Sequence, residues 1–367
     1  MTKQPIAFFA HHQGRGHANR IKAIAEHIPE TRDLVIMTAA PGQFDAIPRD
    51  ARIIELPNMI GAPSRSPALH DQPTPEVMHC VPLGVAEMRE HMGVIAETLR
   101  TCDPALFVVD VSAEIALLAR VMSVPAISIR MHGQRGDPGH LAAYEASVAM
   151  LAPFDEALEQ DDYPKWARER THYTGGLCTT RDPVLDRSMA RERLGLDKER
   201  SITLVIAGGG GSGTPYAPLT VAARAEPEAL WLVAGPVHRE GHETEFGNLR
   251  ELGWIDNLTD YLSAADRVVA SAGDNTVHEI ARAEKPFLCI PEWRYFDEQR
   301  TKAAQLQRLG AAVVRETWPA SIPEWQDVLR QTDALDTNAS AALHNPDAAR
   351  DAAMWLEKEA DRLWATS

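Results

Sequence analysis

The stretch Ile6–Arg20, IAFFAHHQGRGHANR, combines an apolar run, a glycine-containing turn and the start of a helical pattern. Its first four residues form a short apolar run that is typical of a buried strand. A Gly-x-Gly turn at Gly14 and Gly16 follows, and helical spacing then runs from His17 to Ile28. A strand, a tight turn and a helix in this order predict the first part of a βαβ unit. The N-terminus of such a helix offers free N–H groups to an anion.

The same alternation of strand and helix continues along the chain. Strands are predicted over 6–10, 34–38, 52–56, 106–110 and 126–130, and again over 202–207, 230–234, 267–271, 286–290 and 311–314. Alternation of this kind predicts parallel sheets built from right-handed crossovers. The expected fold is therefore α/β, with two doubly wound, Rossmann-like domains facing each other across a cleft. The expected limits are 1–178, with a C-terminal helix at 347–365 packing back on this domain, and 183–345.

Composition excludes several classes of protein. The 367 residues carry a net charge of −15, which argues against a nucleic-acid-binding protein and against attraction to anionic membranes. The four cysteines are widely spaced and show no CxxC motif, so neither a disulfide framework nor a zinc site is predicted from them. No signal peptide and no membrane-spanning run is recognised, and a cytoplasmic protein is expected.

Ligands of doubly wound sheets bind beyond the carboxyl ends of the strands, where four loops of this chain carry unusual residues. The first loop is the Gly14 turn. A dinucleotide fingerprint would require a third glycine where Asn19 stands, so NAD and FAD are disfavoured. The second loop is AGGGGSGT, 207–214, which lacks the lysine of an ATP-binding P-loop. Four consecutive glycines directly after a buried strand favour close approach to a phosphate or substrate over a flexible connector.

The third and fourth loops precede helices with polar first turns. In SAGDNTVHEIARAEKP, 271–286, Thr276 and Glu279 match a capping box, and Glu279 could instead accept hydrogen bonds from the hydroxyls of a ribose. In PEWRYFDEQR, 291–300, Asp297 is a candidate N-cap, while Glu298 and Gln299 could bind sugar hydroxyls.

The order of these motifs carries a resemblance. The glycine loop, the Ser-x-Gly…Glu helix and the Asp-x-Gln helix resemble the C-terminal half of GT-B glycosyltransferases, in particular family 28 and the MurG-type N-acetylglucosaminyltransferases. The N-terminal QGRGHANR resembles the GxGHxxR turn of that superfamily, which includes a UDP-sugar hydrolase. Further likenesses are HGQRG at 132–136, the Gly-Gly…Arg pattern at 175–181, and GWID at 253–256.

The resemblance implies roles for individual residues on the donor side. The backbone of Ile255 contacts uracil, Glu279 holds the ribose, and the glycine loop approaches the diphosphate or the sugar. Arg181 faces the diphosphate, and Gln299 binds sugar hydroxyls. The donor-binding set is Gly14, Gly16, Arg181, Gly209, Gly210, Gly211, Ser212, Gly213, Ile255, Ser271, Gly273, Asn275, Thr276, Glu279, Glu298 and Gln299. The MurG pattern has Gln-Gln where this chain has Gln299-Arg300, so the resemblance does not fix the donor sugar.

Catalysis is expected at His17 and Asp110. An imidazole at a helix N-terminus can take a proton at neutral pH. Asp110 ends a predicted strand and is either a base or the N-cap of a helix starting near Ser112. Arg20 adds positive potential or forms a surface salt bridge. The acceptor-side residues are expected to be His12, His132 and Gln134.

These assignments imply transfer of a hexosyl group from a UDP-sugar to an acceptor hydroxyl, inverting and independent of metal, with no cofactor. The expected partners are a nucleotide sugar and an unidentified acceptor (a glycan, a lipid-linked molecule or a small molecule), with no nucleic acid and at most peripheral membrane contact. Two alternatives stay open, a UDP-sugar hydrolase in which His17 activates water, and a non-catalytic nucleotide-sugar-binding partner subunit. Nucleotide release without an acceptor favours the first, and tolerance of losing His17 and Asp110 favours the second.

Overall fold

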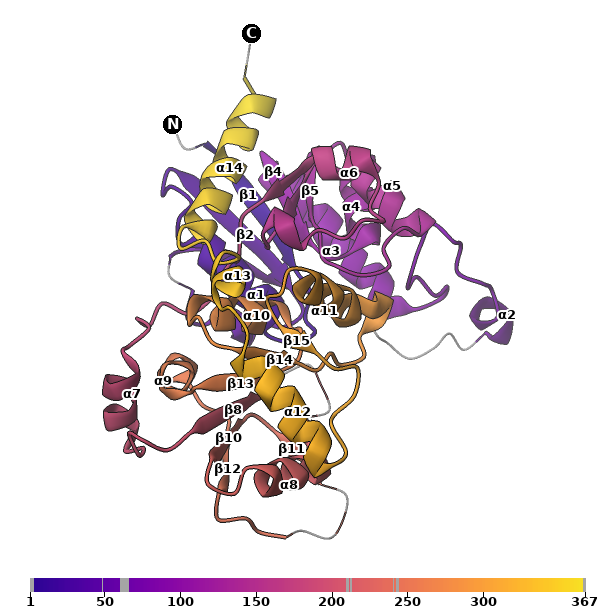
Figure 1. Cartoon of the computed structure of the whole chain (residues 1–367). Coiled ribbons are helices and arrows are strands. Elements are labelled where there is room, and N and C mark those ends of the chain that lie inside the picture. The colour runs from indigo at the N-terminus through magenta and orange to yellow at the C-terminus, as the bar shows by residue number, and fades with distance from the viewer. Residues whose placement is uncertain are drawn as a thin grey trace. The chain divides into compact units, whose positions relative to one another are not determined.

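The structure is a computed structural model that describes residues 3–47, 49–59, 66–208, 211, 213–239, 241 and 244–365. Its contacts divide the chain into two compact units (Figure 1). The first unit comprises Met1–Pro153, Asp161–Thr174 and Asp347–Ser367, and the second comprises Phe154–Gln160 and Gly175–Pro346. Each unit contains a parallel sheet flanked by helices, so the predicted α/β fold with two Rossmann-like domains is confirmed.

The first unit is built on a parallel sheet of order β3-β2-β1-β4-β5-β6-β7. Its elements are β1 (Lys3–Ala10), α1 (Gly16–Ala25), β2 (Arg32–Thr38), η1 (Pro41–Phe44), β3 (Arg52–Glu55), α2 (Pro67–His70), α3 (Ala86–Cys102), β4 (Leu106–Asp110), α4 (Ala113–Val121), β5 (Ala126–Ile129), α5 (Pro138–Ala146), β6 (Ala149–Ala152), α6 (Lys165–Glu169), β7 (Thr171–Tyr173) and α14 (Ala348–Leu363). The central strands are apolar throughout because helices cover both faces of a parallel sheet. Phe9 and Val109 on adjacent strands pack with Ile95 of α3 in this core.

The last helix, α14, belongs to the first unit and packs against α1 (yellow in Figure 1). Arg32 is buried and its Nη2 donates to Asp361 Oδ1 at 2.7 Å and to Glu357 Oε1 at 3.1 Å. Lys3 Nζ also contacts Glu357 and Asp361, at 2.6 and 2.7 Å. The ion pairs in which Arg32 or Glu357 is buried attach α14 to the beginning of the chain.

The second unit is built on a parallel sheet of order β12-β10-β8-β13-β14-β15 with a small β11-β9 pair. Its elements are η2 (Glu156–Leu158), α7 (Arg187–Leu194), β8 (Ile202–Ile206), β9 (Thr214–Pro215), α8 (Tyr216–Ala225), β10 (Leu230–Ala234), β11 (Val237–His238), β12 (Leu249–Gly253), α9 (Leu258–Ala264), β13 (Arg267–Ala270), α10 (Asp274–Arg282), β14 (Phe287–Cys289), η3 (Tyr295–Asp297), α11 (Glu298–Arg308), β15 (Val313–Val314), α12 (Ile322–Asp333) and α13 (Asn338–Ala341). Trp231 of β10 and Trp325 of α12 are fully buried and meet edge to face, with ring centroids 5.4 Å apart.

One short segment departs from the expected domain limits. The expected first domain ran without interruption to residue 178, but 154–160 groups with the second unit. Arg308 at the end of α11 donates to the carbonyl of Ala157 at 2.6 Å, and η2 packs against α11. These contacts hold the segment to the second unit although its neighbours in sequence belong to the first.

The expected loop at 58–82 lies partly outside the described residues, and its described part contains the short helix α2. Among the residues that the structure describes, no helix is long and apolar enough to cross a membrane.

Candidate functional site

The turn after β1 exposes the beginning of α1. Gly14 has a φ of +75°, in the left-handed region that side chains disfavour, so the turn requires glycine at this position. The helix begins at Gly16 with Arg15 as N-cap, and no side chain accepts a hydrogen bond from its first turn at the cap. The local geometry suits an approaching anion, which is the role predicted for Gly14 and Gly16.

His17 and Asp110 come together in the first unit, with Arg20 beside them. His17 Nδ1 lies 3.1 Å from Asp110 Oδ1. Arg20 Nη1 donates to both carboxylate oxygens, at 3.0 and 3.2 Å. The Asp110 side chain is fully buried at the end of β4, whereas the His17 side chain is 19% exposed. The carboxylate can therefore orient the imidazole but cannot reach a substrate itself.

This geometry corrects two expectations. Asp110 does not cap α4, whose N-cap is Ser112. The salt bridge of Arg20 is buried rather than on the surface, because the Arg20 side chain extends from α1 to Asp110 at the end of β4. Burial raises the pKa of Asp110, but the positive charge of Arg20 and the contact with His17 outweigh it and hold the pKa below 3.8. An ionised carboxylate beside Nδ1 can orient the imidazole so that Nε2 is the nitrogen turned away from Asp110.

Three further histidines surround this pair. The rings of His11 and His12 are stacked with centroids 4.8 Å apart, and His11 lies 5.6 Å from the ring of His17. Burial and the neighbouring imidazoles lower the pKa of His11 to about 4 and also lower the pKa of His12. His91 Nδ1 lies 2.7 Å from the carbonyl of Pro57, and burial lowers the pKa of His91 as well. These rings are neutral at pH 7, so His17 sits in a polar but uncharged surrounding apart from the Asp110–Arg20 pair.

The other acceptor-side residues differ in exposure. His132, predicted to line the acceptor site, is completely buried after β5, and its carbonyl accepts from Arg135 Nε at 3.0 Å. Gln134 is exposed in the same loop. Gln134 is therefore accessible to an acceptor, whereas the buried side chain of His132 cannot contact one directly.

The glycine loop of the second unit requires its glycines for steric reasons. A Cβ on Gly213, whose φ is +89°, would lie 2.8 Å from the carbonyl oxygen of Pro236. A Cβ on Gly211 would collide with the carboxylate of Glu292. Gly209, Gly210 and Ser212 lie outside the described residues. Glu292 was not predicted from the sequence, and it faces the loop from beyond the end of β14.

Four predicted donor-binding residues converge beyond the ends of β8 and β13. A Cβ on Gly273 would lie 3.8 Å from Thr276 Oγ1, 3.9 Å from Ser271 Oγ and 4.0 Å from Gln299 Nε2. Helix α10 begins at Asp274, with Gly273 as N-cap, so Asn275 and Thr276 lie in its first turn. The capping box expected from Thr276 and Glu279 is therefore wrong, because the helix starts before Thr276.

Glu279 is buried and holds a neighbouring segment of the same unit. Its Oε1 accepts from the backbone N–H groups of Thr179 and Thr180 at 3.0 and 3.1 Å. Its Oε2 accepts from Thr180 Oγ1 at 2.8 Å and lies 3.4 Å from Arg282 Nη1. Glu279 thus fixes the backbone that leads to Arg181. A ribose hydroxyl would have to bind a carboxylate that already accepts hydrogen bonds from Thr179 and Thr180.

The beginning of α11 has an unusual backbone. Phe296 and Asp297 both have positive φ, 60° and 52°, a conformation that costs about 1–3 kcal/mol per residue and clusters at ligand sites. Asp297 is at the N-cap but makes no side-chain cap bond, so the expected capping role is wrong. Gln299 is buried, and its Oε1 accepts from the N–H of Glu292 at 2.8 Å. The amide nitrogen of Gln299 is the group that lies near Gly273, while Glu298 stays partly exposed in the first turn.

Helices α10 and α11 are also joined by a buried charge pair that the sequence did not reveal. Lys302 is completely buried, and its Nζ pairs with Asp274 at the start of α10. Lys302 lies three residues after Gln299, so both side chains project from the same face of α11. The three-residue spacing could have indicated from the sequence that Lys302 lies beside Gln299, but it could not identify Asp274 as the partner of Lys302.

Ile255 lies in the loop between β12 and α9 and is partly exposed. It follows Gly253, with a φ of +65°, and Trp254, which is 70% exposed. The backbone of this loop is accessible, as its predicted contact with a base requires.

Comparison with known proteins identifies the proteins that this chain resembles in sequence and fold. Residues 223–354 match the glycosyltransferase family 28 C-terminal domain. The UDP-N-acetylglucosamine–N-acetylmuramyl-(pentapeptide) pyrophosphoryl-undecaprenol N-acetylglucosamine transferase of Acetivibrio thermocellus is 25% identical over 325 residues, 82% of this chain and 81% of that protein. Other bacterial transferases of the same name match over shorter stretches, for example 56% of the length of the Carboxydothermus hydrogenoformans protein.

Solved structures share the fold. MurG from Acinetobacter baumannii superposes with a TM-score of 0.64 at 14% identity, covering 97% of this chain and all of that one. A UDP-GlcNAc 2-epimerase from Neisseria meningitidis superposes with a TM-score of 0.59 at 12% identity, over 96% and 98% of the two chains. The fold alone therefore accommodates different reactions.

Fold, family match and sequence relatives together define the class of protein: this chain is a glycosyltransferase of the GT-B type. More narrowly, residues 223–354 match the C-terminal domain of glycosyltransferase family 28, and the chain is MurG-like.

Proposed function

We propose that this glycosyltransferase moves a hexosyl group from a UDP-sugar to an acceptor hydroxyl, with inversion and without a divalent metal ion. The observation that carries the proposal is the His17–Asp110–Arg20 arrangement at the start of α1, in which a partly exposed imidazole is backed by a buried carboxylate. The names of the bacterial relatives, which are UDP-N-acetylglucosamine transferases, support a UDP-sugar as donor.

His17 acts as the general base. Its Nδ1 lies beside the Asp110 carboxylate, so Nε2 takes the proton of the acceptor hydroxyl. The acceptor oxygen then forms a bond to the anomeric carbon, while the bond from that carbon to the diphosphate oxygen breaks and UDP leaves with the electron pair. Asp110 and Arg20 are positioning residues, because both are buried and act through His17.

The donor is bound by the second unit. The polar groups around Gly273 provide both donors and acceptors, which suits sugar hydroxyls. The glycine loop and Arg181 approach the diphosphate, where positive charge and backbone N–H groups stabilise the leaving group. Ile255 contacts the base through its backbone. The acceptor is a glycan, a lipid-linked molecule or a small molecule, and Gln134 and His12 contact it.

The test is a nucleotide-release assay with a panel of UDP- and dTDP-sugars. Each donor is incubated with and without acceptors, and one arm contains the lipid-linked acceptor named for the bacterial relatives. Release that depends on both a UDP-sugar and an acceptor, with a glycosylated product detected by mass spectrometry, is the expected result. Equally fast release without any acceptor identifies a hydrolase and overturns the proposal.

His17→Ala is the matching variant. It is expected to lower turnover about 100-fold or more, the range for loss of a general base, with unchanged UDP affinity. His27→Ala is the control, because His27 is an exposed histidine just after the same helix. Normal turnover by a folded His17→Ala protein would exclude His17 as the base.

A further inference from the structure

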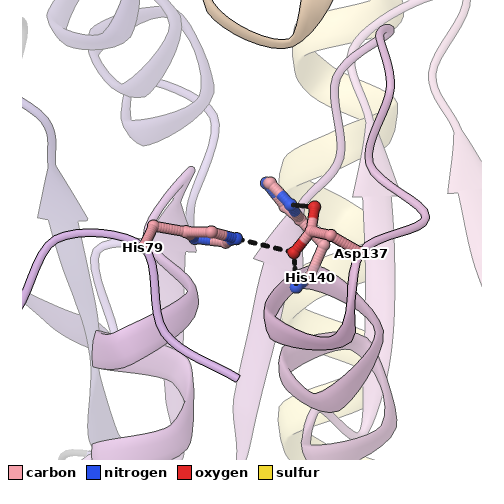
Figure 2. A group of neighbouring side chains, drawn as sticks. All are labelled: His79, Asp137 and His140. Atoms are coloured by element: carbon pink, nitrogen blue, oxygen red, sulfur yellow. Dashed lines mark hydrogen bonds and ion pairs between the residues drawn. The ribbon is translucent and has the colours of Figure 1, made fainter. Parts of the chain in front are cut away.

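A cluster of two histidines and an aspartate lies in the first unit, next to the loop that carries His132 and Gln134. Among the described residues, His79, Asp137 and His140 each offer a ligand atom, and these atoms lie within 4.8 Å of one another (Figure 2). His79 comes from the segment before α3, Asp137 is the N-cap of α5, and His140 lies in the first turn of α5. Neither the resemblance nor the proposed transfer gives the cluster a role.

We propose that His79, Asp137 and His140 bind a divalent transition-metal ion of the zinc class. His79 Nε2 lies 2.7 Å from Asp137 Oδ1, and His140 Nδ1 lies 2.5 Å from Asp137 Oδ2. Both rings thus present a nitrogen to the same carboxylate, and the ring centroids are 4.3 Å apart. Two imidazoles and a carboxylate are ligands that zinc accepts, whereas magnesium and calcium take oxygen ligands.

The ligand atoms are close enough to reach an ion with small rotations. Zinc binds nitrogen and oxygen at about 2.0–2.2 Å, so tetrahedral ligand atoms stand roughly 3.3 Å apart. The two contacts with Asp137 must each open by less than an ångström, in which case the ion lies between the rings and the carboxylate and each ring carries its proton on its other nitrogen. Three protein ligands leave a fourth position for water.

The surroundings of His79 fit this role. Glu114 Oε1 lies 3.8 Å from His79 Nδ1, the nitrogen that does not face Asp137. A carboxylate behind the second nitrogen is the usual outer partner of a metal-bound histidine. Glu114 also accepts from the backbone N–H of His79 at 2.7 Å and fixes the segment. Gly139 provides the space, because a Cβ there would lie 2.8 Å from His79 Nε2.

Arg135 opposes the ion in the arrangement seen here. Its Nη1 lies 2.9 Å from His140 Nε2 and can only donate, so Nε2 accepts and Nδ1 carries the proton toward Asp137. Metal binding at Nδ1 moves the ring proton to Nε2, where it would face the guanidinium. Arg135 must therefore turn aside when the ion binds. The geometry thus predicts a direction of effect for Arg135 that a purely structural cluster would not produce.

The experiment is a zinc titration of the full chain after treatment with a chelator, in competition with a chromophoric chelator. Wild-type protein is expected to bind one zinc ion through this cluster, and cobalt at the same site to give the strong visible absorption of tetrahedral coordination. His79→Gln and Asp137→Asn are expected to weaken zinc binding at least about tenfold. Asparagine remains a good N-cap, so Asp137→Asn keeps α5 intact.

Two variants test the outer residues. Glu114→Gln is expected to weaken binding by about 10-fold or more, as loss of an outer partner does. Arg135→Gln is expected to strengthen it, because the amide oxygen of glutamine can accept the proton on His140 Nε2. His17→Ala serves as the control, since it removes one histidine of the group formed with His11 and His12 and should leave zinc affinity unchanged.

The proposal is overturned if His79→Gln and Asp137→Asn bind zinc as tightly as wild type, or if wild type binds none. Unchanged or weaker binding by a folded Arg135→Gln protein also contradicts it. These measurements do not depend on transfer activity, so the metal site and the proposed function are tested independently of each other.

Discussion

Arg20 Nη1 lies 3.0 Å from Asp110 Oδ1, and both side chains are buried in the first unit. Each charge has lost its hydration and depends on the other for compensation. The same carboxylate contacts His17 Nδ1, so the ion pair links the stability of the unit to the orientation of its candidate base.

Arg20→Met should strongly destabilise the protein. Removing one partner leaves Asp110 charged and buried, which lowers the free energy of unfolding by about 3–5 kcal/mol. Urea denaturation measures the loss. Arg20→Met/Asp110→Asn should recover part of it, because no unpaired charge remains. Arg100→Met is the matched control, since the Arg100–Glu97 pair is exposed to water and its loss should change stability little. Equal losses in the two single variants would contradict the buried pairing.

Asp110→Asn should reduce turnover more than it reduces binding. The amide cannot stabilise the protonated imidazole as a carboxylate does, so kcat is expected to fall about 100-fold or more. Steady-state kinetics and calorimetry with UDP, both below the melting temperature of the variant, separate the two effects. Parallel losses of kcat and UDP affinity would instead indicate general structural damage.

Stability should fall on mild acidification because of His11. Its pKa is about 4 in the folded protein and 6.5 when unperturbed, so between these values the unfolded state binds a proton that the folded state does not. The contribution of the neutral ring is fully present above pH 6.5 and is lost as the pH falls toward 4. The groups facing it are His12, His17, His91 and Asp110.

The variant that tests this is His11→Gln, which does not titrate. It should reduce the slope of unfolding free energy against pH in this window by up to about 1.4 kcal/mol per pH unit. Denaturant titrations at several pH values measure the slope. An identical slope in wild type and variant would show that the His11 ring is protonated at the same pH in both states.

Glu279→Ala should affect stability and UDP binding together. The variant leaves the N–H groups of Thr179 and Thr180 without their acceptor, which costs about 1–3 kcal/mol. It also releases the segment that carries Arg181, so UDP affinity should fall. Thr180→Val removes the hydroxyl contacts with Glu279, Arg282 and Thr259 but leaves both backbone N–H groups paired with Glu279, and it should have the smaller effect. Lower stability with unchanged UDP affinity would restrict Glu279 to a structural role.

Gly211→Ala should impair donor binding. The new Cβ meets the Glu292 carboxylate, so the loop or the glutamate must move, and KM for the donor is expected to rise at least about tenfold, or ~1.4 kcal/mol. Gly247→Ala is the control, because a Cβ at Gly247 meets nothing within 4 Å. Steady-state kinetics with the donor measure KM for both variants. An unchanged KM for Gly211→Ala would show that the glycine loop does not contact the donor.

The sequence predicted elements best where burial is uniform. β4 at 106–110 and β10 at 230–234 have the predicted limits, because their residues are apolar on both faces. β12, Leu249–Gly253, was missed because it is an edge strand with charged, exposed residues, and β7 because Thr171–Tyr173 is short and only half-buried.

Contacts between distant residues were beyond the sequence. A helical spacing places Arg20 one turn after His17, but only the β1–β4 pairing shows that both meet Asp110. The local sequence suggested that Glu279 belongs to a capping box. Its actual partners, Thr179 and Thr180, lie about 100 residues earlier and could not be inferred from neighbouring residues. The His79–Asp137–His140 cluster follows no metal-binding spacing, since its first member is 58 residues from the second.

The attachment of α14 to the first unit has a consequence for synthesis on the ribosome. Every residue of the second unit emerges before α14 does, so the later unit can complete its folding while the earlier one still lacks a helix. Until then, the surface of the first unit that buries Ala352, Leu356 and Ala360 of α14 is open to water, and Arg32 has no carboxylate from α14. The nascent first unit is therefore the part of this chain that depends most on chaperones, although it is translated first.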